Sequence, residues 1–204
     1  MIKIKNIIFD LGGVILNIDL KRTELAFAEL GVGNFKEYYT LQTATPLFED
    51  LELGHITPKN FYDEFRKLAK LPLTDEQIRT AWNRLLVNFP VETIDWLKNI
   101  KSKYNIFLLS NTNEIHYEAF TKMFEEEIGV GKLDDQFVSA YYSFRIGLRK
   151  PSKESYEEIL KTEELTAAET LFIDDSMQNI QGAASVGLQT RYLPSPHTVM
   201  ELHL

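Results

Sequence analysis

The sequence predicts an α/β fold with a mostly parallel sheet and a small helical segment inserted after the first strand. Short apolar runs alternate with amphipathic stretches from Pro90 onward, and polar residues follow several of these runs directly. Between Asp10 and Pro90 this alternation is absent and only helical patterns occur. Strands that alternate with helices through short connections are typical of a parallel sheet covered by helices on both faces.

The first predicted strand is the apolar run from Ile4 to Phe9, which ends at Asp10 and is followed by Gly12 and Gly13. Open α/β sheets place their chemistry at the carboxyl ends of the strands. A carboxylate at such a position is costly to bury unless a metal, hydrogen bonds or a reacting group compensates its charge. Asp10 is therefore a candidate functional residue, although a single aspartate there is explained more simply as the cap of a turn.

The segment after the first strand predicts helices. Leu20 to Leu30 form one amphipathic pattern, and Thr57-Pro58 begins another. Thr74-Asp75-Glu76-Gln77 has the form of a capping box that begins a third helix. We expect a helical cap over residues 17–88 and a core domain formed by residues 1–16 and 89–204.

The second half of the chain predicts the rest of the sheet and its covering helices. Pro90 suits the first turn of a helix, and Gly187 suits the end of one. The expected strands are Ile106 to Leu109, Phe137 to Ala140, Thr170 to Ile173 and Leu188 to Leu193. The expected helices run from Pro90 to Ile100, Glu114 to Phe124, Ser152 to Leu160 and Met177 to Val186.

Polar residues follow these later strands or lie in the adjoining loops. Four sequences carry them, in this order: Phe9-Asp10-Leu11-Gly12-Gly13-Val14, Leu109-Ser110-Asn111-Thr112-Asn113, Gly147-Leu148-Arg149-Lys150-Pro151 and Phe172-Ile173-Asp174-Asp175. Together they resemble the four motifs of the haloacid dehalogenase-like (HAD) phosphohydrolase superfamily, over nearly the whole chain. With Asn179-Ile180-Gln181-Gly182-Ala183 they look most like the bacterial α-D-glucose-1-phosphate phosphatase branch.

The resemblance implies a Rossmann-like core and a Mg²⁺-dependent phosphatase of small phosphorylated metabolites, such as hexose 1-phosphates. In the mechanism it implies, Asp10 attacks phosphorus and forms an aspartyl-phosphate. Ser110, Asn111 and Lys150 would hold the phosphoryl oxygens, and Lys150 would also neutralise their charge. The implied ligands of Mg²⁺ are Asp10, the backbone carbonyl of Gly12, Asp174 and Asp175.

One position departs from the wider superfamily. Most HAD phosphatases carry a second aspartate two residues after the nucleophile, where this chain has Gly12. General acid-base help contributes roughly 10²–10⁴-fold in rate. The glucose-1-phosphate branch shares the glycine, and we hypothesise that an anomeric oxygen, being a better leaving group, needs less help. Asp19, Glu49 and His55 are candidate replacements for the missing acid.

Simpler explanations exist for the other candidates. Ser110 and the Asp174-Asp175 pair could each cap a helix, and Lys150 could be a solvated lysine. The four histidines match no metal-ligand spacing and are expected at the surface or in local hydrogen bonds. Arg149 fits either a site residue or a salt-bridge partner. Arg22, Glu49 and Glu52 are polar candidates within the predicted cap.

Composition limits the function further. The 204 residues carry a net charge of −8, which argues against a nucleic-acid partner. The chain has no cysteine, so disulfides and thiol catalysis are excluded. It has no apolar run of about 18 residues, so no membrane span is expected. Met1 to Asn6 do not resemble a signal peptide, and we expect a cytoplasmic protein.

Two other functions fit the same motifs. A 2-haloacid dehalogenase also has a nucleophilic aspartate without the second aspartate, and it needs no Mg²⁺. A non-catalytic regulator would bind a phosphorylated ligand without turning it over. Metal dependence separates the dehalogenase from the phosphatase, and turnover separates both from the regulator. The oligomeric state is not specified by any of these patterns.

Overall fold

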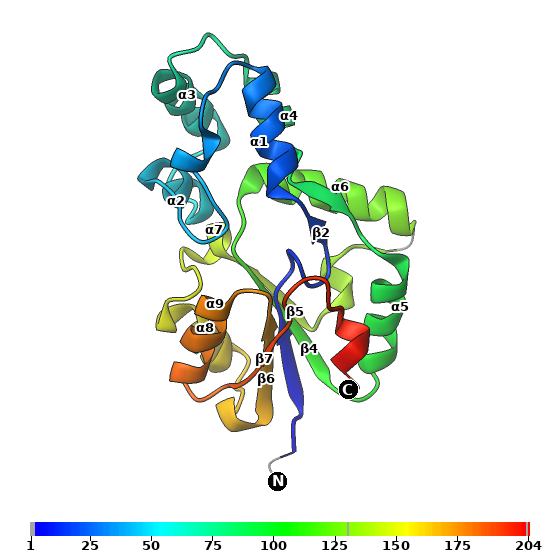
Figure 1. Ribbon diagram of the computed structural model, residues 1–204. Helices are drawn as coiled ribbons and strands as arrows, with labels where there is room; N and C mark the ends of the chain where they lie inside the picture. Colours follow the sequence, from blue (N-terminus) through cyan, green and yellow to red (C-terminus); the bar gives the residue numbers. More distant parts are fainter. Residues whose placement is uncertain (1–2, 130, 203) are drawn as a thin grey trace.

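The computed structural model describes residues 3–129, 131–202 and 204. Its centre is a five-stranded sheet in the order β5-β4-β1-β6-β7, with every neighbouring pair parallel (Figure 1). Ile8 in the middle strand lies beside Phe107 and Phe172. The strands are β1 (Asn6–Phe9), β4 (Asn105–Ser110), β5 (Ser139–Tyr142), β6 (Thr170–Asp174) and β7 (Gln189–Tyr192). The α/β fold predicted from the sequence is confirmed.

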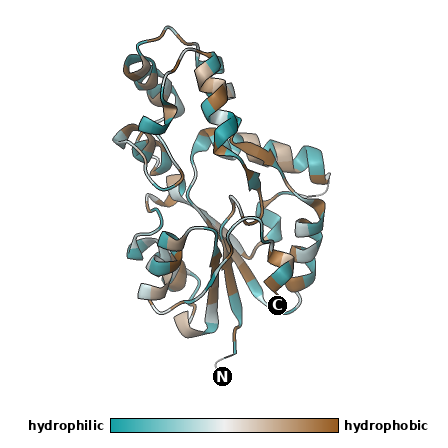
Figure 2. Ribbon diagram, viewed as in Figure 1, coloured by the Kyte–Doolittle hydropathy of each residue, from teal (hydrophilic) through white to brown (hydrophobic). Residues whose placement is uncertain are grey.

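Helices cover both faces of this sheet. Because side chains alternate along a strand, Ile7 and Phe9 pack into one buried cluster with α5 (Val91–Ile100) and α6 (Glu114–Ile128). Ile8 packs into another with α8 (Lys153–Thr162) and α9 (Met177–Ser185). The central strands β4, β1 and β6 are accordingly mostly apolar (Figure 2), whereas the edge strand β7 is not. The helices of both layers therefore pack against the strands whose ends meet at one edge of the sheet.

The helices α1 (Leu20–Glu29), α2 (Pro46–Glu52), α3 (Pro58–Ala69) and α4 (Asp75–Asn83) lie beyond this edge (Figure 1). They share a separate buried cluster that is rich in aromatic rings, such as Phe27 stacked on Phe35 at 4.6 Å between ring centroids. Burying one such ring contributes roughly 1.5–3 kcal/mol. Two predicted helix starts are confirmed, since Thr57 caps α3 and Thr74 forms a capping box with Gln77.

Two short strands connect the helical segment to the core. β2 (Asn17–Ile18) pairs antiparallel with β3 (Leu86–Asn88). The expectation of helix signals alone between Asp10 and Pro90 was therefore wrong. Strands of two and three residues are too short to show the alternation that identifies a strand. Their pairing brings the beginning and the end of the inserted segment together.

Other elements also differ from the sequence-based expectation. α2 and the short α7 (Ser143–Ile146) were not anticipated, and β5 begins two residues later than expected. α6 continues past Phe124 to Ile128 and ends where Gly129 adopts a left-handed conformation. The remaining short elements are 3₁₀ helices: η1 (Phe35–Glu37), η2 (Asp134–Gln136), η3 (Ala167–Glu169) and η4 (Val199–Leu202). No helix in the described part of the chain is both long and apolar enough to cross a membrane.

Candidate active site

Lys150 connects two acidic residues at the edge of the sheet. Its ammonium nitrogen lies 2.7 Å from Asp10 Oδ1 and 2.7 Å from Asp174 Oδ2. The Lys150 side chain is 1% exposed, so both ion pairs are shielded from water. A lysine this deeply buried between two carboxylates is not one of the solvated lysines of the surface.

The topology explains this meeting of distant residues. β1 and β6 are neighbours in register, with Phe9 beside Ile173, so Asp10 and Asp174 follow at the same level. The Asp10 amide donates to the Ile173 carbonyl at 2.9 Å, which extends the pairing to the aspartate itself. Both carboxylates therefore stand at the carboxyl edge of the sheet, where open α/β folds bind ligands.

The acidic loop after β6 is held by hydrogen bonds and by a glycine. Asp174 accepts hydrogen bonds from the Ser176 amide at 2.7 Å and from the Asn179 side chain at 3.0 Å and 3.1 Å. Gly13 has φ +78° and faces Asp175 so closely that a Cβ there would lie 2.2 Å from Asp175 Oδ2. Glycine at this position therefore leaves room for the Asp175 carboxylate.

Three carboxylates gather at this point and fit a divalent cation. Asp10, Asp174 and Asp175 each offer an oxygen, and these oxygens lie within 4.8 Å of one another. When all three are ionised, their three negative charges face the single charge of Lys150 and leave an excess of two. Hard oxygen donors in this number suit Mg²⁺. Burial, partly offset by Lys150, raises the pKa of Asp10 to about 7; burial with Asp174 nearby raises the pKa of Asp175 to about 6.

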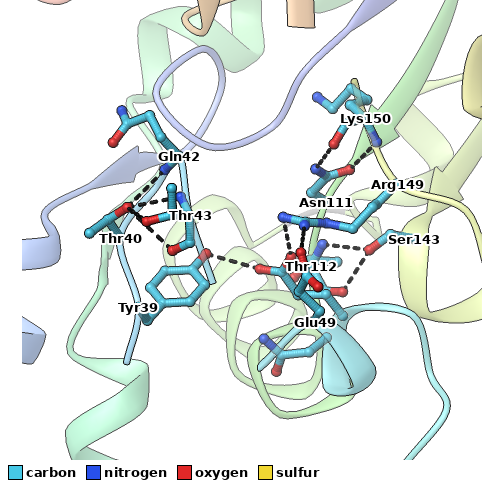
Figure 3. A network of polar contacts seen from close by, with 12 residues as sticks. Tyr39, Thr40, Gln42, Thr43, Glu49, Asn111, Thr112, Ser143, Arg149 and Lys150 are labelled. Carbon is cyan, nitrogen blue, oxygen red and sulfur yellow. Dashed lines mark hydrogen bonds and ion pairs between the residues drawn. The ribbon is translucent and has the colours of Figure 1, made fainter. Parts of the chain in front are cut away.

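The loop after β4 supports Lys150. The Asn111 side chain donates to the Lys150 carbonyl at 2.8 Å and accepts from the Lys150 amide at 2.9 Å (Figure 3). Thr112 is fixed in turn by Ser143, whose hydroxyl accepts from the Thr112 amide and donates to the Thr112 carbonyl, both at 2.9 Å. The cap of α6 is Asn113, so capping does not explain Ser110.

A pocket lies over these residues. Its core side is lined by Asp10, Gly12, Ser110, Lys150 and Asp175. Its other side is lined by residues of the helical segment, among them Tyr39, Gln42 and Glu52. The arrangement brings a nucleophilic carboxylate, a buried cation and an acidic metal site together, and such a set is suited to phosphoryl transfer.

Comparison with known families agrees with this geometry. Residues 4–187 match the model of the haloacid dehalogenase-like hydrolase family. The chain belongs to this family.

Individual relatives of this HAD-like hydrolase match it over more than nine tenths of its length. A D-ribitol-5-phosphate phosphatase from Bacteroides thetaiotaomicron is 32% identical over 92% of this chain and 90% of that protein. A HAD family enzyme from the same organism, solved with magnesium and inorganic phosphate, is 33% identical with a TM-score of 0.93 and covers 98% and 99% of the two chains. A predicted HAD-like hydrolase from Porphyromonas gingivalis is 29% identical with a TM-score of 0.86 over 95% and 93%.

The sequence left Arg149 undecided, and in this HAD-like hydrolase it joins core and helical segment. Its guanidinium lies 2.8 Å from Glu49 Oε1 and 2.9 Å from Glu52 Oε2 (Figure 3). The Tyr39 hydroxyl donates to Glu52 Oε1 at 2.9 Å. Burial raises the pKa of Glu52, while Arg149 and Tyr39 oppose that shift. Tyr39 was missed because an isolated tyrosine in a helical region carries no signal of such a contact.

His116 is the histidine whose position differs most from expectation. It was expected at the surface or in a local hydrogen bond, and it does contact Asn113, but it is buried. Its ring stacks on Trp82 at 4.5 Å between centroids, and its Nε2 donates to the Trp82 carbonyl at 3.2 Å. Burial lowers its pKa to about 4. The neutral ring therefore joins α6 to α4.

Candidates proposed from the sequence to replace the missing acid occupy other places. Asp19 caps α1 by accepting from the Lys21 amide, and His55 is exposed and paired with Asp50. Neither is among the described residues that line the pocket. Arg22 Nη1 lies 3.5 Å from the Leu86 carbonyl, and His197 pairs with Glu201. His203 lies outside the described residues.

Proposed function

We propose that this protein is a Mg²⁺-dependent phosphatase of small sugar and polyol phosphates, and that it works through an aspartyl-phosphate on Asp10. The observation that carries the proposal is the buried Lys150, which contacts Asp10 and Asp174 beside a third carboxylate. The names of the relatives support it, since one is a phosphatase of ribitol 5-phosphate and another binds magnesium and phosphate.

The proposed roles follow from position. Asp10 attacks phosphorus and the bond from phosphorus to the ester oxygen breaks, while Lys150 neutralises charge on the phosphoryl oxygens. The leaving oxygen takes a proton from water. Ser110 and the Asn111 backbone hold those oxygens, while the Asn111 side chain keeps Lys150 in place. Water then attacks the aspartyl-phosphate, which releases inorganic phosphate and the Asp10 carboxylate.

The metal ligands proposed are Asp10, the Gly12 carbonyl, Asp174 and Asp175. When bound, Mg²⁺ supplies positive charge that offsets the phosphate and keeps the Asp10 carboxylate ionised. Asp174 is already oriented by Asn179 and the Ser176 amide, so the acidic loop needs little rearrangement to receive a cation.

We further propose that residues 17–88 act as the cap that shapes the leaving-group side of the pocket. Tyr39, Gln42 and Glu52 come from this segment and line the same pocket as Asp10. The ribitol 5-phosphate of the relative and the hexose 1-phosphates predicted from the sequence are both candidate substrates. A cysteine-free chain fits the cytoplasm, where we place the enzyme.

The test is phosphate release from sugar 1-phosphates, sugar 6-phosphates and alditol phosphates, with and without Mg²⁺. Turnover that requires Mg²⁺ and is lost in Asp10→Asn supports the proposal. A folded protein that releases halide from 2-haloacids without metal would instead be a dehalogenase. A folded protein that binds phosphate esters without turnover would be a regulator.

A further inference from the structure

Each cation among the described residues that line the pocket is paired with two carboxylates. Among its described lining residues only Arg149 and Lys150 carry positive charge, because His116 is held neutral by burial. Lys150 is paired with Asp10 and Asp174, and Arg149 is paired with Glu49 and Glu52. Lys150 is assigned above to the phosphoryl group. Arg149 is thus the one described lining cation left to meet charge on the leaving group.

The Glu52 carboxylate is fixed on this wall of the pocket. Its side chain is 4% exposed and is held by Arg149 and by the Tyr39 hydroxyl. The end of α2 is also pressed against α7, since a Cβ on Gly54 would lie 2.1 Å from the Phe144 carbonyl oxygen. The backbone that carries Glu52 therefore cannot shift away from Arg149 without disturbing this contact.

We propose that Glu52 determines specificity by restricting the pocket to monophosphates whose leaving group is uncharged. The proposal rests on the phosphatase function proposed above. Glu49, Glu52 and Arg149 together carry one excess negative charge. A second carboxylate or phosphate placed against them loses its hydration, meets no unpaired cation and is repelled. Hydroxyl groups do not suffer this penalty, and Gln42, Tyr39 and Thr112 line the same pocket as uncharged hydrogen-bonding partners.

Matched substrate pairs test the proposal in the unmodified enzyme. Ribitol 5-phosphate and ribonate 5-phosphate differ only at the far carbon, which is a hydroxymethyl group in one and a carboxylate in the other. Glycerol 3-phosphate with 3-phosphoglycerate, and glucitol 6-phosphate with gluconate 6-phosphate, repeat the comparison at two other lengths. We expect kcat/KM to favour the alditol roughly 100-fold in the pair that turns over best, as a like-charge repulsion at close range requires.

Two variants that each remove one negative charge beside Arg149 show which glutamate sets the alditol preference. Glu52→Gln keeps the shape of the side chain and partly frees Arg149, so we expect the alditol preference to fall about tenfold, mainly through a lower KM for the aldonate. Glu49→Gln removes the same charge from the same arginine, but that side chain is 45% exposed and is not among the described lining residues. The alditol preference of Glu49→Gln should differ from that of the native enzyme by less than about threefold, because water screens the exposed Glu49 charge.

The outcomes separate this inference from the function on which it rests. If no alditol or sugar phosphate is hydrolysed by folded enzyme, the proposed function itself fails. If alditol and aldonate phosphates are hydrolysed alike at all three lengths, or the aldonate is preferred, only the specificity proposal fails. Equal shifts in the two variants would show a general charge effect and would also overturn it. Should Glu52→Gln prove unstable on thermal melting, the unmodified enzyme still decides through the three substrate pairs.

Discussion

Lys150 shows at the scale of one residue how the site is organised. Burial lowers the pKa of Lys150, but Asp10 and Asp174 outweigh this effect and hold it above its usual range. The ammonium therefore stays charged near neutral pH. It is the positive charge that allows three carboxylates to lie together before any cation arrives. Arg149 next to it is in a similar environment, since Glu49 and Glu52 also set two carboxylates against its one charge.

Gly13→Ala should disable the metal site without touching a ligand. The added Cβ would lie 2.2 Å from Asp175 Oδ2, and φ +78° is strained for alanine. We expect a loss of roughly 10- to 100-fold in Mg²⁺-dependent turnover, of the size seen when an orienting contact is lost. Gly33→Ala is the control, because a Cβ there meets nothing within 4 Å. Normal activity in Gly13→Ala would show that the Asp175 carboxylate does not have to occupy the space beside Gly13.

Gly12→Asp should restore general acid help. Its Cβ would lie 3.1 Å from Ile18 Cδ1, the flexible end of a side chain that can move. We expect phosphate esters of ordinary alcohols to be hydrolysed at least about tenfold faster, because full general acid catalysis contributes roughly 10²–10⁴-fold. Sugar 1-phosphates should change little, since their leaving group needs less help. Initial rates on both classes measure this, and equal gains would contradict the explanation given for the glycine.

At the scale of elements, the regular helices and strands could be predicted and their contacts could not. Thr74-Asp75-Glu76-Gln77 carries its own capping signal, so the start of α4 is readable locally. β2 and β3 are too short to carry a pattern, and each is stable only because the other pairs with it. The helix α7 is likewise only four residues long, although its Ser143 fixes the loop at Thr112.

The contact of α6 with α4 should make stability depend on pH. The pKa of His116 falls from 6.5 to about 4 on folding, so the unfolded chain binds a proton in this range that the folded chain does not. The stability that the folded protein has while His116 is neutral in both states is complete above pH 6.5 and is lost as pH falls towards 4. Between pH 7 and 4.5 we expect the native protein to lose about 2 kcal/mol more unfolding free energy than His116→Gln.

Urea denaturation at several pH values measures this difference. The comparison between native protein and His116→Gln removes the contributions of the active-site carboxylates, which both proteins share. His55→Gln serves as the control for replacing a histidine, because that side chain is exposed. Parallel curves for native protein and His116→Gln would mean that His116 does not titrate as its burial requires.

At the scale of the whole molecule, the strand-end residues of the site could be predicted because their order follows from the topology. Asp10, Ser110 and Asp174 each end a predicted strand or follow it directly, and a parallel sheet brings such ends to one edge. The Arg149 contact with Glu49 joins residues 100 positions apart. No local pattern indicates such a pairing, since it depends on how the helical segment sits over the core.

The charge of the site should also govern the stability of the whole protein. Three carboxylates face one lysine, so Mg²⁺ should stabilise the fold. At about 100 times its dissociation constant a ligand contributes about 2.7 kcal/mol, which corresponds to a rise of roughly 5–10 °C in Tm for a chain of this size. We expect this rise when Mg²⁺ is added to the EDTA-treated protein.

Asp175→Asn should raise the metal-free Tm, because it removes one of the clustered like charges, and should reduce the rise in Tm on adding Mg²⁺ by more than half. Asp95→Asn, at an exposed position on α5, should behave like the native protein; a full Mg²⁺ shift in Asp175→Asn would place the cation elsewhere.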